Sequence, residues 1–119
     1  MNRSECLDKA KEIVNGARQE NYGSPEKNFE EIARYWSIFL DRDISAIDVA
    51  LMMVLMKLAR LQNKPDHDDS WIDIAGYAAN GAEIATYCRD DEKLLNEWYD
   101  QNHIKVKLDL SPVECKELK

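Results

Sequence analysis

Apolar side chains recur at three- and four-residue steps along four stretches of the chain, and this spacing predicts four helices. The first helix is expected from Ser4, as its N-cap, to about Arg18. The second is expected from Pro25 to about Leu40, because Ser24 and Pro25 suit the cap and first turn of a helix. The predicted buried faces are Leu7, Ala10, Val14 and Ala17 in the first helix and Phe29, Ile32, Trp36 and Phe39 in the second.

The third helix is the most apolar stretch of the chain. It opens at Ser45, which forms a capping-box-like pair with Asp48, and it runs to about Leu61. Because apolar residues surround it almost completely, we expect it to be the central helix of a bundle. Lys57 interrupts it on an apolar side. A lysine there either extends its ammonium group to solvent or meets a carboxylate or an anion.

The fourth helix is expected from Asp69 and extends toward Gln101. Its first turns carry one stripe of apolar side chains and one stripe of polar side chains. Two carboxylates four residues apart repel each other unless a cation or basic side chains neutralise them. A structural alternative makes Asp69 an N-cap and Asp73 a solvated acid of the first turn. Gly76 and Gly81 predict a close helix approach or room for a ligand. The apolar stripe is Ile72, Ala75, Ala79 and Ala82, and the polar stripe is Asp69, Asp73, Tyr77 and Asn80.

The last part of the chain changes its period. Apolar residues alternate strictly with polar ones from Ile104 to Leu110, which is a strand pattern. A single strand leaves its backbone groups unpaired, so we expect residues 103–119 to pair with a neighbouring copy and form a homo-oligomer. The predicted organisation is an all-α helical domain over residues 1–102, followed by this C-terminal β-strand tail.

Composition narrows the classes of function. The 119 residues carry a formal net charge of −7, and 45% of them are hydrophobic. The length predicts one domain, and the acidic balance argues against binding a nucleic acid polymer, which needs a basic surface. The longest apolar run, residues 49–56, is too short to span a membrane. Three distant cysteines and no signal-peptide pattern favour free thiols in the cytoplasm.

Four motifs that combine charged, amide and aromatic residues follow one another along the helices. They are Arg18-x-x-x-Tyr22-Gly23, Asn28-Phe29-x-x-Ile32-Ala-x-x-Trp36, Asp48-Val-Ala-Leu-Met-Met-x-x-x-Lys57-x-Ala-Arg60 and Asp69-x-x-x-Asp73-Ile-Ala-Gly76-Tyr77. In this order they resemble an uncharacterised family of small phage and prophage proteins, over about residues 5–87. A phage-encoded protein of this kind is expected in the cytoplasm of the host.

More distantly, the helical layout resembles the all-α nucleoside triphosphate pyrophosphohydrolases of the MazG and dimeric dUTPase type, which implies a four-helix MazG-like bundle. Those enzymes hold Mg²⁺ with E-x-x-E on one helix and E-x-x-D on the next. The second helix of this chain has no E-x-x-E. Asp73 is the plausible counterpart of the E-x-x-D acid.

The resemblance implies a phage Mg²⁺-dependent pyrophosphohydrolase that acts on a (deoxy)nucleoside triphosphate. Acidic oxygen ligands suit Mg²⁺, which bridges substrate phosphates and lowers the pKa of a bound water. The implied catalytic residues are Asp73 and Asp69, and the implied metal ligands are Asp69, Asp73 and Asp48. The residues implied to contact phosphate are Arg18, Lys57 and Arg60. Those implied to contact the base or the sugar are Tyr22, Asn28, Trp36 and Tyr77.

Two other functions fit the same residues. The first is a non-catalytic nucleotide-binding sponge, an anti-defence protein that sequesters a cyclic nucleotide signal and needs no metal. The second is a structural oligomer in which the acids of the fourth helix and the bases of the third form a buried ion-pair network.

Overall fold

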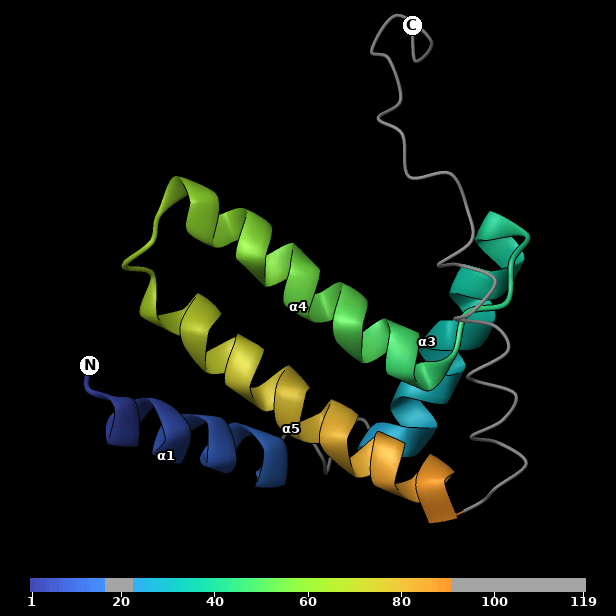
Figure 1. Ribbon diagram of the computed structural model, residues 1–119, viewed down its shortest axis with the longest axis horizontal. Coiled ribbons are helices and arrows are strands. Elements are labelled where there is room, and N and C mark those ends of the chain that lie inside the picture. The colour runs from blue at the N-terminus through green and yellow to red at the C-terminus, as the bar shows by residue number, and fades with distance from the viewer. Residues whose placement is uncertain (17–22, 91–119) are drawn as a thin grey trace, which may run out of the picture.

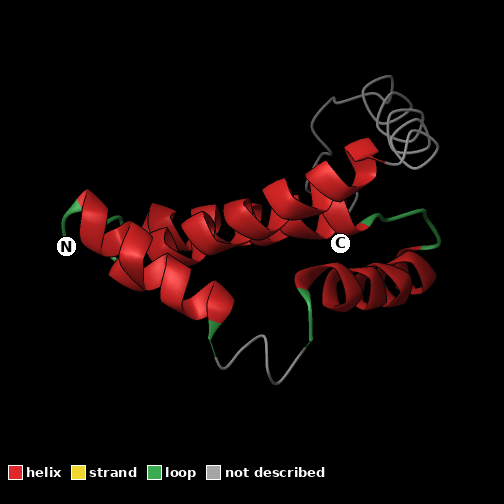
Figure 2. Ribbon diagram, turned by 90° about the horizontal axis from the view of Figure 1, so that it is seen from below, coloured by secondary structure: helices red, strands yellow, loops and turns green. Residues whose placement is uncertain are grey.

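The computed structural model describes residues 1–16 and 23–90, which form helices and no strand (Figures 1 and 2). The helices are α1 (Arg3–Asn15), α3 (Pro25–Leu40), α4 (Ala46–Asn63) and α5 (Asp68–Asp90). The predicted all-α class with four helices is confirmed for this part of the chain. The expected C-terminal strand tail, residues 103–119, lies outside the described residues.

The helices are arranged around α5. α4 and α5 form an antiparallel pair, α1 lies along the other side of α5, and α3 crosses the pair near the start of α4 (Figure 1). α5 contacts each of the other three helices, whereas α4 contacts only α3 and α5. The central helix is therefore α5 and not, as its apolar composition predicted, α4. None of the described helices is long and apolar enough to cross a bilayer.

Side-chain caps fix the first residues of α1 and α3. Asn2 caps α1 and forms a capping box with Glu5, so the predicted cap at Ser4 is wrong because Ser4 lies inside the first turn. Ser24 caps α3 as predicted, where its hydroxyl accepts a hydrogen bond from the backbone N–H of Lys27 at 3.4 Å. These local bonds satisfy donors that a helix start otherwise leaves unpaired.

The hydrophobic core lies where α3, α4 and α5 meet. Ile32 and Trp36 pack against it, but the predicted burial of Phe39 and Leu7 is wrong, since they are 88% and 63% exposed. α3 crosses the α4–α5 pair and does not lie along it, so its last turn extends beyond these two helices (Figure 1). α1 is buried through Ala10, one turn further on. The buried core residues are Phe29, Ala33, Ile47, Val49, Ala50, Tyr77 and Ile84.

α5 turns its polar stripe toward the interior. Tyr77 is buried and Asp73 is half-buried, whereas Ala79 and Ala82 of the predicted apolar stripe are exposed. Tyr77 and Ile84 carry more apolar area than alanine, so burying their side of the helix removes more surface from water. Within the apolar stripe, Ile72 is buried and Ala75 is half-buried, so this stripe faces the interior only in the first turns of α5.

The glycines of α5 mark close helix approaches. A Cβ atom at Gly76 would lie 3.4 Å from Val14 Cγ1 of α1, and one at Gly81 would lie 3.2 Å from Ala50 Cβ of α4. The predicted close approach is confirmed, and it brings the backbone of α5 against two neighbours at once.

Candidate functional site

An ion pair joins α4 to α5 in the interior. Lys57 Nζ lies 2.7 Å from Asp73 Oδ2, and the two side chains are only 8% and 14% exposed. Removing these charges from water costs free energy that close pairing offsets. The predicted contact of Lys57 with a carboxylate is confirmed for Asp73. Asp69, one turn earlier, is exposed.

A small pocket opens beside Asp73, between α1, α3 and α5. Its volume is about 40 Å³, which is room for about three water molecules. The polar residues that line it are Asn28, Asp73, Tyr77 and Asn80, and its apolar walls include Ile13, Val14, Phe29 and Ile72. Three predicted site residues that are distant in sequence, Asn28, Asp73 and Tyr77, therefore meet at one place.

The pocket offers hydrogen-bonding groups, and the Asp73 carboxylate that lines it is paired with Lys57. Each asparagine amide can donate and accept, and the Asp73 carboxylate accepts. The Phe29 and Tyr77 rings lie 6.5 Å apart between centroids, tilted by 45°, and form one wall. No lysine or arginine among the described residues lines the pocket. This surface suits an uncharged planar group with N–H donors better than a phosphate.

The other residues expected to bind a ligand lie elsewhere. Lys57 pairs with Asp73 and Trp36 packs against the core, so neither lines the pocket. Arg60 is exposed near the end of α4. Arg18 and Tyr22 lie outside the described residues.

The three acids expected to hold Mg²⁺ have different surroundings. Asp48 is buried in a complete capping box: its backbone N–H donates to Ser45 Oγ at 3.1 Å, and Ser45 N–H donates to Asp48 Oδ2 at 2.9 Å. Asp73 pairs with Lys57, and Asp69 is exposed. In residues 1–16 and 23–90, no group of three or more His, Cys, Asp or Glu side chains could hold a metal. These residues of a single chain therefore do not fit the implied Mg²⁺ site.

Asn80 is the polar residue of the pocket that sequence reasoning left out of the site. It belonged to the same polar stripe as Asp73 and Tyr77, so helical spacing was the signal that could have found it. Ile13 and Val14 of α1 were not identifiable in this way, because the packing of α1 on α5 is a contact between distant parts of the sequence.

A serine and a histidine also meet, at the start of α5. His67 Nδ1 lies 2.7 Å from Ser70 Oγ, but Ser70 is completely buried. A nucleophile must reach its substrate, so we assign this pair to the helix start and not to catalysis.

Comparison with known proteins identifies a family and two relatives from mycobacteriophages. The family described as "Domain of unknown function (DUF6378)" matches residues 5–85. The chain is 47% identical over 72 residues to the Gene 55 protein of Mycobacterium phage D29, and 42% identical over 73 residues to the Gene 55 protein of Mycobacterium phage L5. Each match covers 60% of this chain, and 48% and 47% of the relatives, so the match spans about half of their length. No solved structure matches.

Proposed function

Since the chain belongs to the DUF6378 family of phage proteins, we propose its function from the pocket: it binds the base of a nucleotide and does not hydrolyse it. The observation that carries this proposal is the convergence of Asn28, Asp73 and Tyr77 on one pocket, together with Asn80.

The chemistry of the pocket supports a base and not a phosphate. A base edge presents N–H donors and ring or carbonyl acceptors, which the amides and the carboxylate complement. The pocket volume of about 40 Å³ admits such an edge and not a whole nucleotide. The sugar and phosphates would lie outside it, and Arg18 and Tyr22 are the residues we propose for them.

Binding without hydrolysis is supported by the surroundings of the acids. A phage protein of this kind would act as a sponge that sequesters a nucleotide signal, such as a cyclic nucleotide of host defence. Sequestration requires affinity but no metal, and Asp48 and Asp73 already have structural partners.

A Mg²⁺-dependent pyrophosphohydrolase of the MazG type is the second candidate. It is favoured by Asp73, which lines the pocket at the position that resembles the E-x-x-D acid of those enzymes. Because the described residues of one chain do not supply the ligand set, this function needs carboxylates from another part of the assembly.

A panel of canonical and cyclic nucleotides, mixed with the full chain and followed by calorimetry and chromatography, tests the proposal. We expect one ligand to bind, to be recovered intact after heat denaturation, and to bind equally well when Mg²⁺ is chelated. Asn28→Ala and Asn80→Ala should each weaken binding by about 10-fold to 100-fold, the loss of a buried hydrogen bond. The matched control is Asn63→Ala, because Asn63 is exposed at the end of α4.

Other outcomes of this assay oppose the proposal. Release of pyrophosphate or a monophosphate over many turnovers would favour the hydrolase. Failure of every nucleotide to bind would contradict both functions.

The expected homo-oligomer formed through residues 103–119 also stays a proposal. Its test is deletion of those residues, which should lower the mass measured by light scattering.

A further inference from the structure

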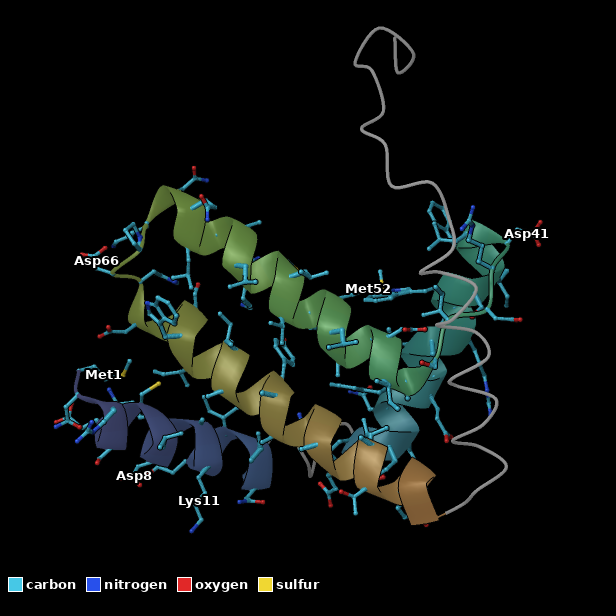
Figure 3. All side chains as sticks on the ribbon, in the orientation of Figure 1. Met1, Asp8, Lys11, Asp41, Met52 and Asp66 are labelled. Atoms are coloured by element: carbon cyan, nitrogen blue, oxygen red, sulfur yellow. The ribbon has the colours of Figure 1, made fainter. Side chains whose placement is uncertain are left out.

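One face of α4 is apolar and exposed in the single chain. Its large side chains are 37–62% exposed, although each is a leucine or a methionine. Figure 3 places Met52 on the side of α4 turned away from α5. Monomeric proteins seldom expose such a continuous apolar surface without a binding role. We call this surface the outer face of α4, and it consists of Leu51, Met52, Leu55, Met56 and Leu58.

The outer face carries no charge. The charged residues of α4 are Asp48, Lys57 and Arg60. Lys57 is buried against Asp73 of α5. Asp48 lies one turn before Leu51 and Met52 on the same side of the helix, but it is buried in the capping box with Ser45. Arg60 is exposed, and its helical position puts it beside Met56, at the edge of the face. The outer face is thus a neutral apolar strip on a chain whose net charge is −7.

We propose that the outer face of α4 binds the same face of a second copy of this chain, with the two α4 helices antiparallel. This homodimer would bury a surface different from the C-terminal tail, and it does not depend on the proposed nucleotide function.

The spacing along the helix points to a second copy. Leu51, Leu55, Leu58 and Gln62 follow one another at steps of four, three and four. This order of steps is the same from either end of the row. Two antiparallel copies related by a two-fold axis at the middle of the row therefore place Leu55 of one chain opposite Leu58 of the partner. Steps of three and four are also the spacing with which paired helices interlock their side chains. An interface between identical chains must be complementary to itself in this manner.

The net negative charge of the chain also favours a second copy as the partner of the outer face. Two copies of an acidic chain repel each other wherever their carboxylates approach. Association of identical chains therefore needs a surface without exposed acidic residues, and the outer face supplies one over residues 51–58 of α4. A basic partner protein would instead bind the acidic parts of the surface.

The first test compares Leu55→Glu with Leu7→Glu in the full chain, by sedimentation equilibrium over a wide range of concentration. The two leucines are matched in exposure, 62% and 63%, but Leu7 lies on α1. We expect the wild type and Leu7→Glu to reach at least twice the chain mass of 13.8 kDa. Leu55→Glu should have half the mass of the wild type, with unchanged helical circular dichroism. A wild type of single-chain mass, or Leu55→Glu of undiminished mass, would overturn the proposal.

The second test measures the orientation of the helices and does not depend on a disruptive variant. A spin label on Gln62→Cys, with the native cysteines replaced by serine, reports the distance between the two chains of a dimer. Gln62 lies between five and six residues from the midpoint of the row, so antiparallel helices place the two positions about 20 Å apart. Parallel helices would place them about 8–10 Å apart, and that result would overturn the arrangement.

Discussion

The two faces of α4 contrast in what they bury and what they expose. The inner face buries the charged pair formed by Lys57 with Asp73 of α5. The outer face exposes Leu51, Leu55 and Leu58. In an ordinary monomer the charges would lie in water and the leucines inside, because burying charge costs free energy and burying apolar area gains it.

The contrast teaches that the single chain is not optimised for its own stability alone. A buried ion pair is weak evidence for stability, because well-packed apolar residues of similar volume are often as stable or more so. An exposed apolar face contributes to stability only when something covers it. This is why we propose a function for each face of α4, ligand binding in the pocket beside Asp73 for the inner face and association with a second copy for the outer face.

The largest effect is expected when the inner pair is broken. Lys57→Met removes the ion pair and leaves the charged Asp73 side chain, which is 14% exposed, without the ammonium group of Lys57. We expect a loss of about 3–5 kcal/mol in the free energy of unfolding, measured by urea denaturation. The control is Arg60→Met on the same helix, where the side chain is exposed and the change should stay within about 0.5 kcal/mol.

A double substitution shows whether this pair is structural or functional. Lys57→Met with Asp73→Leu removes both charges, and it should restore most of the lost free energy, since an apolar pair avoids the cost of desolvation. If the double variant folds stably but no longer binds the ligand, the pair is retained for the pocket. If Lys57→Met alone costs less than about 1 kcal/mol, water reaches the pair and the contrast between the two faces is much weaker.

A smaller effect is expected at the first turn of α4, where a side-chain cap fixes the start of the helix. Ser45 and Asp48 form a capping box, and Asp48 is buried there. Ser45→Ala should cost about 1 kcal/mol, measured by thermal unfolding, whereas Ser45→Thr keeps the hydroxyl and should cost less. Equal losses for the two variants would show that the cap hydroxyl contributes nothing.

The helices themselves were predictable because their signals are local. Ser24 with Pro25, and Ser45 with Asp48, identify helix starts from neighbours in sequence, and the structure confirms both. Periodicity does not predict which side chains are buried where burial depends on contacts between residues distant in sequence. Asp73 enters the interior because Lys57, sixteen positions earlier, neutralises it, and no window on α5 alone contains that information.

The candidate site was predictable in part for the same reason. The polar stripe of α5 placed Asp73 and Tyr77 together, and the family resemblance implied that Asn28 contacts a base or sugar. Lys57 was expected to hold phosphate as well as face the acids, and only the tertiary contact shows that its ammonium group meets Asp73. For α4, an apolar pattern all round the helix does not distinguish burial within one chain from burial against a second copy.

The smallest effect is expected on the outer face. Its dependence on protein concentration distinguishes burial within one chain from burial against a second copy. Leu51 is 52% exposed, so Leu51→Gln should change the unfolding free energy by less than about 0.5 kcal/mol in protein dilute enough to be monomeric. The matched change Leu61→Gln, at a leucine that is 7% exposed, should cost about 3 kcal/mol or more under the same conditions. As the concentration rises, association adds stability to the wild type by mass action, and its melting temperature should rise. The melting temperature of Leu51→Gln should rise less. A loss that is the same at every concentration would mean that Leu51 is covered within its own chain, and the outer face would then belong to the core.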